Sequence, residues 1–107
     1  MQNPKLKPIL DELREALAAH YGERLSKLVL FGSQARGDAE EDSDIDVLVV
    51  LKGEVDQAQE RRATLESTAE ICLKHSVVIQ RVVVSDARYE TGDDSLMYNV
   101  HLDGVEV

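Results

Sequence analysis

Two short stretches of this chain carry residue types that suit phosphate chemistry: Gly32-Ser33 and, after ten intervening residues, Asp44-Ile45-Asp46. Side chains alternate between the two faces of a β-strand, so we expect Asp44 and Asp46 to project side by side and Ile45 to face the other way. Two carboxylates so close repel each other unless a cation lies between them. Such oxygen ligands suit Mg²⁺, which usually completes its shell with water and substrate phosphates. Since a glycine lets the backbone approach a phosphate and a serine hydroxyl can bond to it, the two stretches together predict a site for Mg²⁺ and a phosphorylated substrate.

Each stretch also has a purely structural explanation. Gly32-Ser33 fits a strand-to-helix turn in which the serine caps the helix. Asp44 and Asp46 end a run of acids of the kind that often forms a solvated loop. The other acids of this run are Asp38, Glu40, Glu41 and Asp42. The apolar residues 47–50 favour the metal interpretation, because a carboxylate at the start of a buried strand is costly without a partner.

The apolar periodicity predicts that helices and strands alternate along the chain. Helices are predicted at residues 4–21, 32–36, 55–75 and 95–103, and strands at 25–31, 44–51 and 77–85. We expect residues 86–93 to form a polar connection, with or without a helical turn, and 105–107 to form a short edge strand or a tail. This order predicts an α/β (α+β) fold in which helices pack on a small mixed β-sheet. The length of 107 residues suits a single domain, 1–107.

The formal net charge of −9 argues against direct binding of nucleic acid, whose phosphate backbone is bound through Lys and Arg. The charge permits a small nucleotide that arrives with Mg²⁺. It also suits a basic protein partner, although many proteins are acidic simply for solubility. The sequence has no apolar run of membrane-spanning length and no signal segment, so we expect no membrane association. With one cysteine, Cys72, and no targeting segment, a cytoplasmic location is expected.

The wider context of both motifs resembles a known family. The stretches are Gly-Ser-Gln-Ala-Arg-Gly at 32–37 and Ser-Asp-Ile-Asp-Val-Leu-Val at 43–49. They are similar to the signature of the minimal nucleotidyltransferase (MNT) family, within the DNA polymerase β-like nucleotidyltransferase superfamily. Proteins of this family are commonly the antitoxin of HEPN/MNT toxin–antitoxin pairs. The resemblance implies the nucleotidyltransferase fold, ATP or another nucleoside triphosphate as substrate, and Mg²⁺ as cofactor.

The resemblance also implies roles for individual residues. Asp44 and Asp46 would bind Mg²⁺ and form the catalytic pair. Gly32 and Ser33 would hold the β- and γ-phosphates of the nucleotide. Two further residues belong to the expected nucleotide-binding region, each with an alternative. Arg36 contacts phosphate or the acceptor, or simply pairs with local acids, and Ser43 shapes the turn before the second strand.

The expected third strand departs from the family pattern. Family members usually carry a third Asp or Glu on a neighbouring strand, where it helps to deprotonate the acceptor, but residues 77–85 contain no acid. Gln80 shares a face with Val82 and Val84, so it marks the equivalent position. A glutamine can coordinate a metal through its carbonyl oxygen but cannot act as a base. Asp86, just beyond the strand, is a candidate substitute, and the departure bears on turnover more than on nucleotide binding.

Three functions are consistent with the sequence. The first is an enzyme that moves AMP, or another nucleoside monophosphate, from a triphosphate to a protein hydroxyl. By resemblance, the acceptor is a tyrosine of a cognate HEPN-type ribonuclease toxin, and the chain acts as its antitoxin. The second is a binding module that keeps the fold and neutralises its partner by binding alone, which the missing third carboxylate favours. The third is a homo-oligomeric transferase for drugs or small metabolites. The brevity of the chain favours a protein acceptor, because larger relatives add a second domain to hold theirs.

Overall fold

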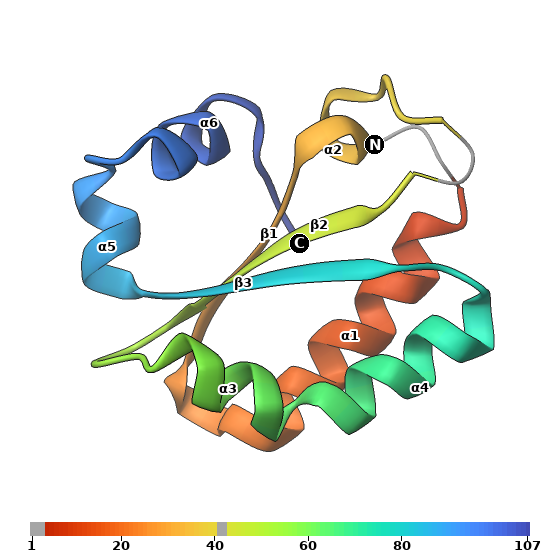
Figure 1. The fold of residues 1–107 in the computed structure, drawn as a ribbon, viewed down its shortest axis with the longest axis horizontal. Helices are drawn as coiled ribbons and strands as arrows, with labels where there is room; N and C mark the ends of the chain where they lie inside the picture. The colour runs from red at the N-terminus through yellow and green to blue at the C-terminus, as the bar shows by residue number, and fades with distance from the viewer. Residues whose placement is uncertain (1–3, 41–42) are drawn as a thin grey trace.

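A four-stranded mixed β-sheet with the strand order β3-β2-β1-β4 forms the centre of the protein (Figure 1). The computed structural model describes residues 4–40 and 43–107. The strands are β1 (Leu25–Phe31), β2 (Ile45–Leu51), β3 (Ile79–Ser85) and β4 (Val105–Glu106). β1 is antiparallel to both β2 and β4, whereas β2 and β3 are parallel. The predicted small mixed sheet is therefore confirmed.

Helices cover both faces of this sheet (Figure 1). On one face lie α1 (Leu6–Tyr21), α3 (Gln57–Ala63) and α4 (Leu65–His75). On the other side lie α2 (Gly32–Arg36), α5 (Asp86–Thr91) and α6 (Ser95–Asp103). A 3₁₀ turn, η1 (Gly22–Arg24), joins α1 to β1, and α3 with α4 forms the crossover between the parallel strands β2 and β3. Within the described chain, every helix is too short or too polar to cross a membrane.

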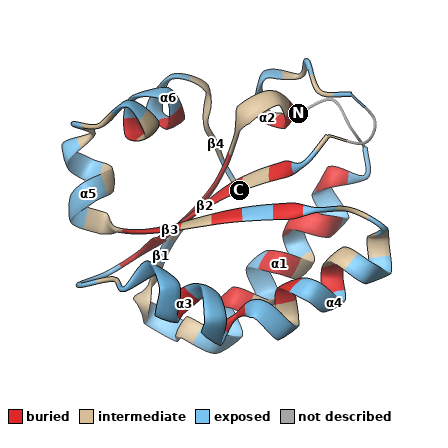
Figure 2. Ribbon diagram, in the orientation of Figure 1, coloured by how far each residue is buried: buried red, intermediate tan, exposed pale blue. Residues whose placement is uncertain are grey.

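Side chains alternate between two apolar clusters along β2, so this central strand is buried on both faces (Figure 2). Val47 and Val49 pack toward α1, whose buried leucines recur at spacings of three and four. These leucines are Leu6, Leu10, Leu13 and Leu17. Leu48 and Val50 pack toward α6 and its buried Met97. Polar side chains on β2 are therefore confined to its first residues, at one end of the sheet.

The predicted helix 55–75 differs from the structure, because it begins at Gln57 and breaks at Thr64 into α3 and α4. The Thr64 hydroxyl donates to the carbonyl of Glu60 at 3.0 Å and accepts a hydrogen bond from the buried guanidinium of Arg81 on β3. Arg81 also donates to the carbonyl of Arg61 at 3.3 Å. Burial in this contact lowers the pKa of Arg81. The break therefore coincides with a contact between distant parts of the chain, which local periodicity does not reveal.

The remaining differences from the prediction are small. β2 begins at Ile45 rather than at residue 44, and β3 begins at Ile79 rather than at residue 77. The expected polar connection 86–93 contains α5, whose first turn is capped by the hydroxyl of Ser85. The end of the chain forms the edge strand β4 against β1. These shifts are at most two residues at the ends of β1, β2 and β3. The candidate site residues therefore stay at the strand ends that the sequence predicts.

Candidate functional site

The Gly-Ser turn and the carboxylate pair meet at one end of the sheet. β1 ends at Phe31, which pairs with Asp46 of β2, and the chain turns at Gly32 into α2. Gly32 has φ +74°, in the left-handed region that glycine adopts without steric penalty. A Cβ on Gly32 would clash with Oδ2 of Asp46 and lie 3.3 Å from its Cγ. Position 32 therefore requires glycine for the turn and also for the close approach of its backbone to the carboxylate.

Asp44 and Asp46 lie close together, as the alternation along the strand predicts. Asp44 is exposed and Asp46 is half-buried, while Ile45 between them is buried in the core on the opposite face. Burial raises the pKa of Asp46, and the negative charge of Asp44 raises it further, whereas Arg36 acts in the opposite direction. The two carboxylates thus repel each other, and a cation bound between them relieves that repulsion.

Gln80 of β3 lies beside this carboxylate pair. In the parallel ladder of β2 and β3, Gln80 is the partner of Asp46, and its Nε2 donates to Oδ2 of Asp44 at 3.3 Å. The strand position expected for a third acid is therefore at the site, and an amide occupies it. Asp86, the other candidate, begins α5 at the opposite end of β3. Because it lies six residues beyond Gln80, or roughly 20 Å along the strand, Asp86 cannot supply the third carboxylate.

Arg36 and Ser43 make local contacts next to the site. Nε of Arg36 lies 3.3 Å from Oδ2 of Asp38, and its Nη1 lies 3.9 Å from Oδ2 of Asp103 on α6. The pairing with nearby acids that the sequence left open is therefore present. Oγ of Ser43 accepts a hydrogen bond from the backbone N–H of Glu40 at 2.9 Å, so Ser43 shapes the turn before β2 as expected. The neighbouring acids at positions 41 and 42 lie outside the described residues.

Gln34 is a site residue that the sequence analysis missed. Its side chain is buried, and its Nε2 donates to the carbonyl of Ser43 at 3.2 Å. This bond ties α2 to the segment that carries the carboxylates and so fixes the turn at Ser33 relative to them. No sequence signal marks Gln34, since its partner is a backbone atom of a loop. In the described structure no side chain caps α2, so the explanation of Ser33 as a capping residue is wrong.

Asp44 and Asp46 fit a magnesium ion that arrives together with a nucleotide. Across residues 4–40 and 43–107, no group of three or more His, Cys, Asp or Glu side chains is arranged to hold a metal by itself. Mg²⁺ is usually held by one or two carboxylates, with water and substrate phosphates in the remaining positions. Two adjacent carboxylates beside a glycine turn meet this requirement.

Comparisons with known proteins agree with this geometry. The nucleotidyltransferase domain family matches residues 10–90. Two proteins of Methanocaldococcus jannaschii, both described as "putative protein adenylyltransferase", are related in sequence. One is 30% identical over 99 residues, which cover 92% of this chain and 95% of the relative. The other is 40% identical over 77 residues, which cover 72% of this chain and 71% of the relative.

The fold is shared with a toxin–antitoxin crystallised with AMP-PNP, at a TM-score of 0.63 and 19% identity. That superposition covers 90% of this chain and 69% of the other. The family match spans β1, β2 and β3, and with them Gly32, both aspartates and Gln80. The chain therefore belongs to the nucleotidyltransferase domain family.

Proposed function

We propose that this chain transfers AMP, or another nucleoside monophosphate, from a nucleoside triphosphate to a hydroxyl group of a protein, with Mg²⁺ as the cofactor. The observation that carries the proposal is the close approach of Gly32 to Asp46, which puts a Gly-Ser turn suited to phosphate binding directly beside a carboxylate pair. The descriptions of the M. jannaschii relatives as protein adenylyltransferases support a protein acceptor. Residues 1–107 would act as one domain in the cytoplasm.

In this reaction the acceptor oxygen forms a bond to the α-phosphorus. The bond between the α-phosphorus and the oxygen that bridges it to the β-phosphorus breaks, and pyrophosphate leaves. The backbone at Gly32 and the hydroxyl of Ser33 would hold the β- and γ-phosphates, which fixes the α-phosphorus in position. Asp44 and Asp46 would hold Mg²⁺, which when bound neutralises phosphate charge. Gln34 would keep the turn and the carboxylates in register through its bond to the carbonyl of Ser43. Most of the catalytic effect would come from this positioning and from charge neutralisation.

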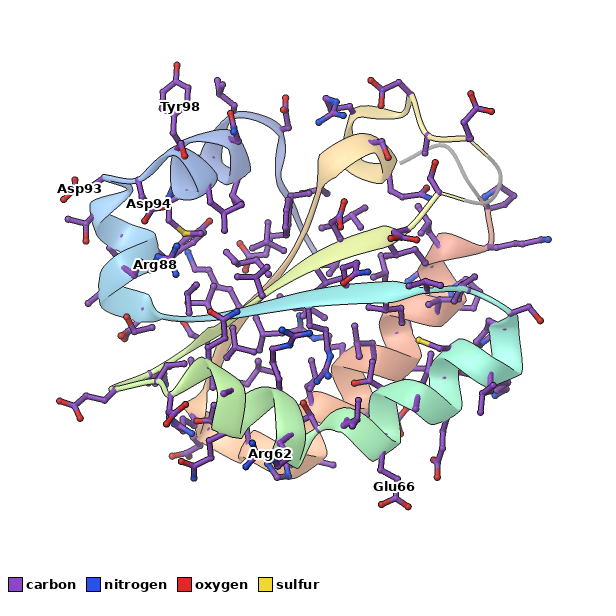
Figure 3. All side chains as sticks on the ribbon, viewed as in Figure 1. Arg62, Glu66, Arg88, Asp93, Asp94 and Tyr98 are labelled. Carbon is purple, nitrogen blue, oxygen red and sulfur yellow. The ribbon has the colours of Figure 1, made fainter. Side chains whose placement is uncertain are left out.

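We further propose that the acceptor is a tyrosine of a cognate HEPN-type toxin, so that the chain acts as an antitoxin. The toxin–antitoxin of similar fold supports a toxin as partner, and the net charge of −9 suits a basic one. The outer surface of α6 adds a structural argument. Tyr98 and Leu102 on this helix are 62% and 63% exposed, and Tyr98 points away from the sheet (Figure 3). Because α6 packs beside α2, a protein that covers this surface would lie next to the site.

The test uses ATP labelled at the α-phosphate or at the γ-phosphate, with Mg²⁺, in a lysate of the source organism. The matched control is the Asp44→Asn/Asp46→Asn protein, whose side chains keep their size and lose their charge. We expect α-label on a protein band with the native chain, no γ-label on that band, and no α-label with the variant. Mg²⁺ and ATP together should also raise the Tm of the native chain, because they bind the folded state. If millimolar Mg²⁺ and ATP leave the Tm unchanged, the nucleotide site is wrong.

A second candidate function is a module that neutralises its partner by binding alone. The amide of Gln80 at the third-carboxylate position favours it, since a glutamine cannot take a proton from the acceptor. The Asp44→Asn/Asp46→Asn protein separates the two functions. A transferase loses its effect on the partner with these substitutions, whereas a module that acts by binding keeps it, provided that the variant still folds and binds.

A further inference from the structure

The two edges of the sheet differ in how they are protected against pairing with another strand. β4, at one edge, has only two residues, of which one is Glu106. β3, at the other edge, has seven residues and runs in unbroken register with β2 (Figure 1). Natural proteins usually protect a long edge strand with a proline, a β-bulge or exposed charges. Over residues 79–85, all of which the structure describes, there is no proline and no bulge, and the only charged side chain, Arg81, is buried.

The backbone of β3 offers unpaired hydrogen-bonding groups along this edge. The N–H of Ile45 donates to the carbonyl of Val78 at 2.9 Å, so the even-numbered residues of β3 direct their backbone groups to β2. The backbone groups of Ile79, Arg81 and Val83 therefore point away from the sheet, and among the described residues they have no hydrogen-bond partner. Their side chains are buried beneath the strand, so these residues present only backbone at the edge. An added strand would satisfy these groups.

Charge favours a second copy of this chain as the added strand. With a net charge of −9, two copies repel each other over most orientations. Residues 71–85 are the longest stretch of the chain without Asp or Glu, so along β3 two copies can approach without opposing carboxylates from either strand. Apolar side chains also gather beside this edge. Leu65 and Leu73 on α4 and Val78 before β3 are 59%, 81% and 53% exposed.

We infer that two copies of this chain pair through β3, antiparallel about a two-fold axis at Val82, and join their sheets into one. This register opposes all seven residues of the two strands. Arg81 lies opposite Val83, where the outward backbone groups bond each other, and Gln80 lies opposite Val84, so no like charges face each other. Because Arg81 is already only 7% exposed, pairing removes little further hydration from its charge.

The same register places residue 78 of one copy opposite residue 86 of the other. Since α5 begins at Asp86 and lies on the same side of the sheet as α2, α5 of each copy would border the proposed nucleotide site of the other (Figure 1). The dimer itself does not depend on the proposed transfer reaction, so its test stands apart from the tests of that reaction.

The test measures molar mass by size-exclusion chromatography with light scattering across a concentration series. We expect the native chain to reach twice the mass of one chain. Val82→Lys and Val82→Glu each place like charges directly opposite each other at the axis, with Cβ atoms about 5 Å apart, so each variant alone should be monomeric. An equimolar mixture of the two should recover the dimer. Leu102→Lys, which adds the same charge on α6, is the control and should stay dimeric. Circular dichroism and the Tm verify that each variant folds.

A cysteine pair tests the same axis without adding charge. The Cα atoms of directly opposite, non-hydrogen-bonded residues lie about 4.5 Å apart, within the range of a disulfide. In a Cys72→Ser background, Val82→Cys should therefore form a covalent dimer on a non-reducing gel when diamide takes two electrons and two protons from the two thiols. Val78→Cys in this background should not, because it faces residue 86 of the second copy.

Four results would overturn the inference. A native chain that stays monomeric over the whole series would leave the edge of β3 to a strand of another protein. A dimer that survives in folded Val82→Lys, or that is lost in Leu102→Lys, would place the interface elsewhere. Failure of the mixed Lys and Glu variants to pair would exclude the axis at Val82. Equal cross-linking of Val82→Cys and Val78→Cys would show that collision, rather than a fixed register, joins the chains.

Discussion

Alanine at position 32 should disable the proposed nucleotide site at only a modest loss of stability. Gly32 has φ +74°, and a non-glycine residue in this left-handed conformation lowers the free energy of unfolding of the protein by about 1–2 kcal/mol. For a domain of this size each kcal/mol lowers the Tm by roughly 4–8 °C. The added Cβ also clashes with Oδ2 of Asp46, so this carboxylate must move. Because a displacement of about 1 Å in a site can reduce the rate about 100-fold, we expect Gly32→Ala to lose label transfer by about that factor.

Gly53→Ala is the matched control for this prediction. Gly53 has φ +83°, so alanine meets the same backbone strain there, but nothing lies within 4 Å of its added Cβ. Thermal unfolding with and without Mg²⁺ and ATP, together with α-label transfer, compares the native chain with both variants. Both variants should lose a similar amount of Tm, and only Gly32→Ala should lose the rise in Tm caused by the ligands. If Gly32→Ala keeps its response to the ligands, the contact between Gly32 and Asp46 is not the basis of the site.

Two further predictions concern the surface. Hydrogen bonds from Lys74 and His75 lower the pKa of Glu12 below its ordinary value of 4.5. The ionised carboxylate therefore stabilises the fold at pH values above 4.5. This stabilisation is lost as the pH falls through the lowered pKa. The Tm of Glu12→Gln should lie below that of the native chain at about pH 6, and a Tm difference that does not shrink as the pH falls below 4.5 would contradict this assignment. Leu102→Ser should reduce label transfer to the protein acceptor, because Leu102 is exposed on α6, which packs beside α2 and therefore beside the site. The acidic net charge of the chain suits a basic partner on this surface. Leu73→Ser, at a site 81% exposed on α4 across the sheet, is its control, and equal losses in the two variants would place the partner elsewhere.

The position of the candidate site was predictable because its signals are local. Gly32 follows a buried apolar strand, and Asp44 with Asp46 opens the next one, so that alternation alone placed the two carboxylates together. Gln80 was predictable for the same reason, since it stands as a polar residue among valines on one face of the third strand. The direction of that strand also excludes Asp86 as the third carboxylate of the site. Parallel strands bring like ends together, which places Asp86 at the opposite end of the sheet.

Other features depend on contacts between distant residues and had no local signal. Gln34 gains its role from the carbonyl of Ser43, whose position depends on the path of the intervening loop. The break at Thr64 lies within a run of good helix formers, and only Arg81 from β3 identifies the place. In both cases a polar side chain satisfies a hydrogen-bonding group that the tertiary structure has buried. Periodicity reports which face of an element is apolar, but it does not report such pairings.

The buried Arg81 leads to a final prediction about stability. Its side chain is buried, burial lowers its pKa, and within the described chain its hydrogen bonds go to two neutral oxygens, those of Thr64 and of the Arg61 backbone. Arg81→Met keeps similar volume and removes a desolvated charge, while the Thr64 hydroxyl keeps its bond to the carbonyl of Glu60. We therefore expect the free energy of unfolding to stay unchanged or to rise by about 1 kcal/mol.

Arg24→Met should have the opposite effect, because it removes one partner of an ion pair. Nη1 of Arg24 lies 2.6 Å from Oε2 of Glu60, a carboxylate with only 8% of the residue exposed. Since Arg24 itself is partly exposed to solvent, we expect a loss of about 1–2 kcal/mol rather than the larger loss typical of a fully buried pair. Urea denaturation of the two variants measures both values. If Arg81→Met lowers the free energy of unfolding as much as Arg24→Met does, the neutral oxygens around Arg81 stabilise its charge as well as a carboxylate does. The break between α3 and α4 would then be a stabilising feature of the fold rather than a consequence of accommodating Arg81.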